Sequence, residues 1–131
     1  MTKTVMIVED DKLNMKLLTD LLKVEGYNTI QQADGMGAYD AILKHRPDLV
    51  LMDIQLPGQS GLEIAEALKS NAELKDIPVI AVTAHAHQED RRTCLDHGCD
   101  GYMAKPISVR SFYDMVSGFI GIGRPDLRVI H

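Results

Sequence analysis

The 131-residue sequence has no apolar run long enough to cross a membrane and no cluster of basic residues. A transmembrane helix needs about 20 consecutive apolar residues, and nothing in this chain approaches that length. The 14 Lys and Arg are scattered and outnumbered by 19 Asp and Glu, whereas binding to a phosphate backbone needs clustered positive charge. The composition therefore predicts a protein that spans no membrane and binds no nucleic acid.

Cysteine is scarce as well, and the two cysteines that occur do not form a known motif. Cys94 and Cys99 are five positions apart, a spacing that matches no CxxC zinc or redox site, so we expect two reduced structural thiols. Walker and GxGxxG loops are absent. The start of the chain has no signal-peptide core, which favours a cytoplasmic location.

Four short apolar runs each lead into a residue that can bind phosphate or metal. They lead into Glu9-Asp10-Asp11, Asp53, Thr83 and Lys105-Pro106. Bare apolar runs of this kind, separated by helix-like segments, predict parallel strands buried on both faces. Because chemistry gathers at the carboxyl ends of the strands in an open parallel sheet, we expect these side chains to meet at one rim.

Segments with helical spacing alternate with the strands. We expect helices over residues 12–25, 36–45, 62–70, 87–97 and 109–120, and a weak strand over 28–32 near a sheet edge. Gly118, Gly121 and Gly123 with Pro125 are expected to end the last helix. The alternation predicts a three-layer α/β/α fold with right-handed crossovers. A single domain over residues 1–124 and a tail over 125–131 follow.

The predicted rim is strongly acidic. Carboxylates at Glu9, Asp10 and Asp53 would be costly to hold together unless a cation lies between them. Mg²⁺ prefers one or two carboxylates, a carbonyl and several waters, so we expect Mg²⁺ here, with Mn²⁺ as the alternative ion. Helix N-capping is a competing explanation for the acidic residues 9–11.

A shielded acidic cluster would allow Asp53 to react with phosphorus, as carboxylates do when they form aspartyl phosphates. Phosphoryl transfer needs mainly positioning and charge neutralisation. Lys105 offers a second cation and Thr83 a hydroxyl hydrogen bond. Taken singly, each fits an ordinary exposed lysine, strand-end threonine or turn aspartate. Their coincidence at the strand ends favours a functional site.

Five motifs, in this order, resemble the receiver domain of two-component response regulators. They are Ile7-Val8-Glu9-Asp10, Leu51-Met52-Asp53, Leu56-Pro57-Gly58-Gln59-Ser60-Gly61, Ala81-Val82-Thr83-Ala84 and Lys105-Pro106. The likeness covers residues 4 to about 120. Among receivers, the chain is most similar to the single-domain, DivK-type regulators of bacterial cell division.

The resemblance implies a flavodoxin-like (βα)5 fold whose five parallel strands lie in the order 2-1-3-4-5. It implies that Asp53 takes a phosphoryl group from a histidine kinase or phosphotransfer protein. Glu9, Asp10, Asp53 and the backbone carbonyl of Gln55 would surround the metal ion. Many receivers have Asp where this chain has Glu9, and the longer side chain would bind the metal through water.

Further roles follow from the same resemblance. Lys105 would pair with the phosphoryl group, while Thr83 and the amide of Ala84 would bind its oxygens. The Lys105-Pro106 peptide would be cis, against a base rate of about 5% for X-Pro bonds. Sequence alone does not predict that isomer.

The output would be a change of surface and not a reaction. Tyr102 matches the aromatic residue that turns inward when the hydroxyl of Thr83 moves toward the phosphoryl group. The surface formed by residues 87–97, the strand through Tyr102 and residues 109–120 would then change its affinity for protein targets as a population shift. Kinases, phosphatases and downstream proteins are the implied partners.

Two other functions fit the sequence less well. Mg²⁺-dependent phosphatases that resemble the haloacid dehalogenase family carry a second Asp two residues after the nucleophile, and this chain has Gln55 there. A flavin-binding module of the same topology would hold phosphate in the first loop, which is acidic here. The pair His85 and His87 is expected in the loop after Thr83 without a Cys or Asp partner there, so we expect exposed histidines and no metal pair.

Overall fold

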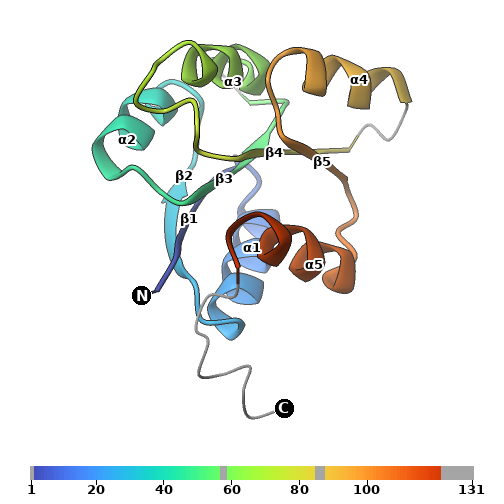
Figure 1. The fold of residues 1–131 in the computed structure, drawn as a ribbon. Helices are drawn as coiled ribbons and strands as arrows, with labels where there is room; N and C mark the ends of the chain where they lie inside the picture. The colour runs from blue at the N-terminus through green and yellow to red at the C-terminus, as the bar shows by residue number, and fades with distance from the viewer. Residues whose placement is uncertain (1, 57–58, 85–87, 122–131) are drawn as a thin grey trace.

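The computed structural model describes residues 2–56, 59–84 and 88–121. Within them, five strands alternate with five helices (Figure 1). In chain order the elements are β1 (Thr4–Val8), α1 (Lys12–Val24), β2 (Asn28–Gln32), α2 (Ala38–His45), β3 (Leu49–Asp53), α3 (Gly61–Lys69), β4 (Val79–Thr83), α4 (Gln88–Asp96), β5 (Gly101–Ala104) and α5 (Val109–Ile120). The expectations for Pro57, Gly58, His85, His87 and the tail fall outside the described residues.

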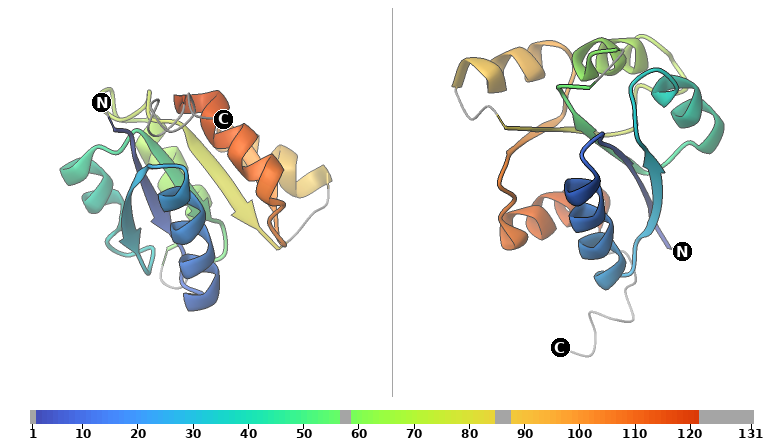
Figure 2. Two further views of the ribbon diagram at one scale, coloured as in Figure 1. Left: turned by 90° about the horizontal axis from the view of Figure 1, so that it is seen from below. Right: turned by 180° about the vertical axis from the view of Figure 1, so that it is seen from behind.

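The sheet is parallel throughout, with strand order β2-β1-β3-β4-β5. This confirms the predicted topology and places β2 at an edge. α1 and α5 cover one face of the sheet, and α2, α3 and α4 cover the other (Figures 1 and 2). The described residues contain no helix that is both long and apolar enough to cross a bilayer.

Each face of the sheet has its own hydrophobic core, because alternate strand residues point to opposite sides. Met6 and Val8 pack with α2, α3 and α4, whereas Val5 and Ile7 pack with α1 and α5. The strand side chains of β1, β3 and β4 are almost fully buried, as the bare apolar runs predicted. Cys94 and Cys99 are buried free thiols in the first of these cores, in agreement with the prediction that they form no disulfide or zinc site.

The helix boundaries match the predictions to within one or two residues. The last helix, α5, ends at Ile120 as predicted, with Gly121 directly after it, and Gly118 lies inside the helix at an exposed position. Arg46 ends α2 in the left-handed conformation, with φ of 46°.

Candidate functional site

The carboxyl ends of β1 and β3 bring three acidic side chains together. Ligand oxygens of Glu9, Asp10 and Asp53 all lie within 4.8 Å of one another. Glu9 and Asp53 are buried and Asp10 is exposed, so the cluster is open to solvent on one side. This arrangement follows from the parallel pairing of β1 with β3, which puts the ends of both strands at the same rim.

Glu9 is held by three partners. Its Oε1 accepts a hydrogen bond from Asn14 Nδ2 and lies 3.0 Å from Lys105 Nζ. Its Oε2 accepts a hydrogen bond of 3.2 Å from the backbone N–H of Asp11. With its side chain only 1% exposed, this carboxylate has little freedom to reorient.

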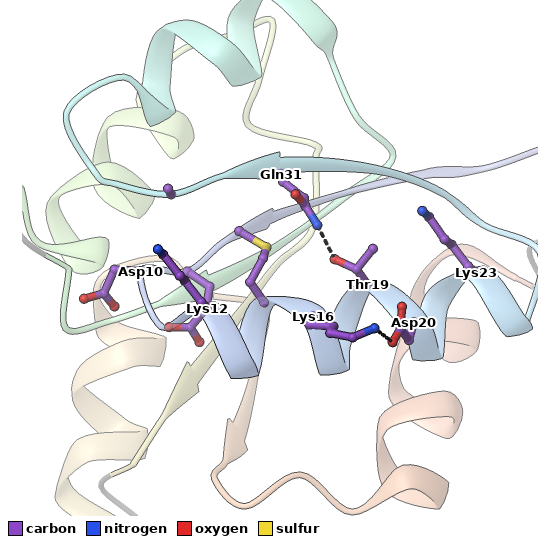
Figure 3. A pocket seen from close by; sticks show the side chains of 10 residues that line it. Asp10, Lys12, Lys16, Thr19, Asp20, Lys23 and Gln31 are labelled. Atoms are coloured by element: carbon purple, nitrogen blue, oxygen red, sulfur yellow. Dashed lines mark hydrogen bonds and ion pairs between the residues drawn. The ribbon is translucent and has the colours of Figure 1, made fainter.

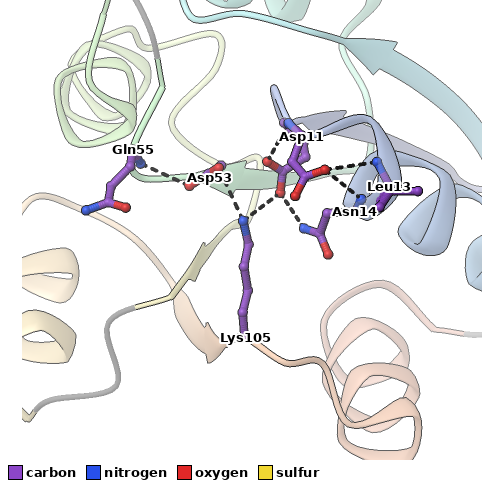
Figure 4. Close-up of polar contacts among 7 residues, drawn as sticks. Asp11, Leu13, Asn14, Asp53, Gln55 and Lys105 are labelled. Atoms are coloured by element: carbon purple, nitrogen blue, oxygen red, sulfur yellow. Dashed lines mark hydrogen bonds and ion pairs between the residues drawn. The ribbon is translucent and has the colours of Figure 1, made fainter.

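Asp53 is held by fewer contacts. The backbone N–H of Gln55 donates to its Oδ1 at 3.0 Å, and Lys105 Nζ donates to its Oδ2 at a longer 3.4 Å. Lys105 comes from the turn after β5 and reaches the acidic cluster with its ammonium group (Figure 4). Its backbone N–H donates to the carbonyl of Thr83 at 2.7 Å, and the Lys105-Pro106 peptide is cis.

The pKa values of the two buried carboxyls of the cluster shift in opposite directions. Burial, followed by the hydrogen bond and repulsion from Glu9, raises the pKa of Asp53 from 3.8 to about 7. Burial also acts to raise the pKa of Glu9, but hydrogen bonds from Asp53, Asn14 and Lys105 outweigh it and lower that pKa. A proton shared by the pair therefore resides mainly on Asp53, the carboxyl that has fewer donors.

The pKa of Lys105 is displaced in the opposite sense to what burial alone would cause. Burial disfavours the ammonium, yet the hydrogen bond to Glu9 and the charge of Asp53 outweigh it and raise the pKa. Lys105 is therefore a permanent cation at neutral pH. It is placed to interact with any negative charge added at Asp53.

Only one of the three consecutive acidic residues serves as a helix cap. Asp11 Oδ1 accepts hydrogen bonds from the backbone N–H groups of Leu13 and Asn14, at 2.9 and 3.5 Å. Glu9 and Asp10 instead belong to the acidic cluster. The capping explanation for residues 9–11 therefore holds for Asp11 alone.

The remaining predicted residues lie around the same rim or just behind it. Thr83 is buried at the end of β4, and the next residue, Ala84, is exposed. Tyr102 lies two residues before the end of β5, is half-buried and packs against the core under α3 and α4. Thr83 and Ala104 are register partners, so β5 carries Lys105 directly past the end of β4.

A glycine allows the chain after β3 to pack closely behind the cluster. A Cβ at Gly61 would lie 2.5 Å from the backbone oxygen of Asp53, a distance that side chains do not tolerate. The backbone N–H of Gly61 also donates to the carbonyl of Ile54 at 3.1 Å. The start of α3 is thereby fixed against the end of β3.

Asn14 is the site residue that the sequence did not reveal. It lies in the first turn of α1, where its spacing from Glu9 puts its amide over the Glu9 carboxylate. A polar residue in the first turn of an amphipathic helix is common, so nothing in the sequence distinguished it. The acidic residues beside it were the stronger signal.

Comparison with known proteins places these residues in a family. Residues 5–117 match the model of the response regulator receiver domain. The chain is 51% identical over 121 residues to the polar-differentiation response regulator DivK of Brucella ovis, covering 92% of this chain and 98% of the relative.

Solved structures give the same result. The receiver domain of a sensor histidine kinase from Pseudomonas aeruginosa, solved with a magnesium ion coordinated in its active-site cleft, is 30% identical with a TM-score of 0.85 and covers 92% of this chain and 99% of that one. The Mn²⁺-bound form of the response regulator Rcp1 is 28% identical with a TM-score of 0.76, covering 88% and 90%.

Proposed function

This chain belongs to the family of response regulator receiver domains, and from that premise we propose that it accepts a phosphoryl group on Asp53 from a histidine kinase or phosphotransfer protein. The observation that carries the proposal is the pairing of a buried, weakly held Asp53 with two further carboxylates and one lysine. Asp53 accepts fewer hydrogen bonds than Glu9, and burial beside Glu9 raises its pKa to about 7.

The acidic cluster fits a hard divalent ion. Three carboxylates with oxygens within 4.8 Å of one another, one of them open to solvent, match the oxygen ligands and waters that Mg²⁺ takes, and Mn²⁺ fits the same donors. Glu9, Asp10 and Asp53 would hold the ion together with the backbone carbonyl of Gln55. A bound cation would supply positive charge to the oxygens of the incoming phosphoryl group.

The side chains and backbone of the site carry out the other steps of phosphoryl transfer. The Asp53 carboxylate oxygen attacks phosphorus and forms the new O–P bond. The P–N bond to the donor histidine breaks, and its imidazole leaves. Lys105 exchanges part of its interaction with Glu9 and Asp53 for the added phosphoryl charge. Thr83 and the amide of Ala84 bind the other oxygens, and Tyr102 turns inward as Thr83 moves.

The proposed output is protein binding through the surface of α4, β5 and α5, in control of the bacterial cell cycle. The similarity to DivK relatives over 98% of their length supports that setting. We place the receiver unit at residues 1–124, with 125–131 as a tail, in the cytoplasm. Residues 91 and 92, the only adjacent arginines, are exposed on α4, within this proposed surface.

The experiment that tests the proposal is phosphorylation by a small donor. Incubation with acetyl phosphate and Mg²⁺ is expected to add one phosphoryl group per chain, stable in acid and labile in base, as an acyl phosphate should be. Intact-mass spectrometry measures it. A chain whose mass does not change, under conditions that phosphorylate another receiver in the same tube, would contradict the proposal.

Turnover separates this function from that of a phosphatase. We expect no sustained release of phosphate from aryl phosphate esters beyond about one equivalent per chain, because Gln55 occupies the position where an aspartyl phosphatase needs a general acid. A steady-state colorimetric assay measures this. Linear release over many equivalents would favour the enzyme.

Mg²⁺ is expected to raise the melting temperature. A ligand bound only by the native state stabilises it by RT ln(1 + [L]/Kd), about 1.4 kcal/mol at ten times Kd, which is several degrees for a domain of this size. Differential scanning fluorimetry at increasing MgCl₂, with matched NaCl as the ionic-strength control, measures the shift. Equal curves in the two salts would argue against a metal site.

Asn14→Ala is expected to weaken Mg²⁺ binding by about tenfold, because groups that orient a metal ligand typically contribute that much to affinity. The Glu9 carboxylate keeps its contacts with Lys105 and Asp11 but loses the amide that fixes Oε1. The midpoint of the Mg²⁺-dependent melting shift measures the loss. Asn28→Ala, an exposed asparagine on β2, is the matched control. Identical midpoints in both variants would remove Asn14 from the site.

A further inference from the structure

A groove of about 510 Å³ lies between α1 and β2 (Figure 3). At one end it includes Glu9 and Asp10, and from there it follows α1 away from the acidic cluster. Charged residues make up much of its lining, namely Lys12, Lys16, Asp20 and Lys23 along α1 and Glu9 and Asp10 at the cluster end. Most of the groove therefore has no part in the phosphorylation proposed above.

The β2 side of the groove, lined by Gln31, borders an open sheet edge. β2 is the terminal strand of the sheet and pairs only with β1. The backbone of Asn28 and that of Gln32 bond toward β1, since Asn28 N donates to Lys3 O and Gln32 O accepts from Glu9 N. Successive residues of a parallel strand turn their backbone groups to opposite sides. Thr29 and Gln31 therefore present their N–H and C=O groups at the open edge.

The other wall carries a row of lysines. Lys12, Lys16 and Lys23 line the groove from α1, with Lys12 and Lys23 at the two ends of the row (Figure 3). Lys16 is paired with Asp20 at 2.7 Å. Within the described part of the chain, no ion pair joins Lys12 or Lys23 to an acidic residue. These two ammonium groups are available to a partner.

The acidic residues of the groove do not neutralise Lys12 and Lys23, because they have other partners. Glu9 is already matched by Lys105 and Asn14, and Asp10 belongs to the acidic cluster. Asp20 is matched by Lys16. Away from the acidic cluster, the charges left over in the groove are the two lysines, so the adjoining edge suits a strand that carries negative charge.

We propose that this groove binds an extended acidic segment of a protein partner, which pairs as an added strand with the open edge of β2 and places carboxylates against Lys12 and Lys23. Lys12 and Lys23 are eleven residues apart on a helix, a rise of about 16 Å, which corresponds to about five residues of a strand. Because alternate strand residues share a face, the matching carboxylates lie four or six positions apart.

A second copy of this chain fits the edge poorly. Antiparallel pairing of two β2 strands would build one continuous sheet about a two-fold axis, and both α1 helices would then lie on the same face, close together. Their lysine rows would face each other, and like charges at such an edge discourage pairing. An acidic strand meets no such repulsion.

Amide spectra of the ¹⁵N-labelled full chain test the proposal. The probe is a ten-residue peptide of alternating Thr and Val with Glu at positions 4 and 8, and the matched probe has Lys at both positions. We expect the Glu peptide to shift the amides of Thr29 and Gln31 at about millimolar concentration, and the Lys peptide to leave them unchanged. No shift with the Glu peptide, or equal shifts with both, would overturn the proposal.

Variants locate the interaction. The double variant Lys12→Glu with Lys23→Glu is expected to weaken binding at least about tenfold, the size of two lost ion pairs with a peptide. Lys44→Glu with Lys75→Glu makes the same charge change at exposed positions outside the groove and should alter binding little. Equal losses in the two double variants would mean a diffuse charge effect and overturn the assigned site.

The strand edge has its own test. Thr29→Pro removes an N–H that β1 does not use, and proline is tolerated at edge positions that face solvent. It should abolish peptide binding while the amide spectrum of α5 stays native. Retained binding by this folded variant would exclude strand addition.

Shifts of the Thr29 and Gln31 amides that grow with protein concentration alone, without peptide, would instead identify a second copy as the occupant.

Discussion

Asp53→Asn is expected to abolish phosphorylation by acetyl phosphate, with no modified chain detectable under conditions that modify the wild type. An amide is a far weaker nucleophile than a carboxylate, and phosphoryl transfer to a side chain needs the charged oxygen. The backbone contact of the site should survive, because an asparagine oxygen can still accept the hydrogen bond of 3.0 Å from the amide of Gln55. Intact-mass spectrometry of the two proteins, treated in parallel, measures the difference.

Asp76→Asn is the matched control for this substitution. Asp76 is exposed and lies in the segment before β4, outside the acidic cluster, so its variant should be phosphorylated like the wild type. Full modification of Asp53→Asn would show that another residue accepts the phosphoryl group, and Asp10 would be the first to examine. Loss in both variants would point to a general effect of the preparation.

The strand ends were predictable because burial on both faces leaves a simple trace in the sequence. Val50, Leu51 and Met52 leave no polar position until Asp53, and the other runs behave likewise. Parallel strands then force their ends onto one rim. The convergence of Glu9, Asp53 and Lys105 therefore required only the strand assignments and the order of the sheet.

Side-chain partners were less predictable. The sequence does not distinguish the roles of the three acidic residues 9–11. The direction in which each side chain points from the β1–α1 turn decides whether it caps the helix or joins the cluster. Asn14 becomes part of the site through the same turn. Gly118 is tolerated inside α5 because a glycine weakens a helix by about 1 kcal/mol, which the packing of Phe112 and Val116 on the sheet outweighs.

The pKa of Asp53 also makes a prediction about folding stability, whose sign can be worked out. The folded chain retains the Asp53 proton up to about pH 7, whereas the unfolded chain releases it near 3.8. Between these values the unfolded state binds fewer protons, so this group lowers the stability of the metal-free protein as pH rises. Glu9 opposes this in part, because its pKa is lowered on folding and its contribution is stabilising above about 4.5.

Asp53→Asn should consequently stabilise the metal-free protein at pH 8, by at most about 4 kcal/mol at 1.36 kcal/mol per pKa unit. The gain should shrink as pH falls and vanish below about pH 3, where the wild-type carboxyl is protonated in both states. Urea unfolding in EDTA at several pH values, with Asp76→Asn as control, measures it. A variant no more stable than wild type at pH 8 would contradict the raised pKa. Saturating Mg²⁺ should reverse the order, since the wild type alone regains a complete set of carboxylates for the cation.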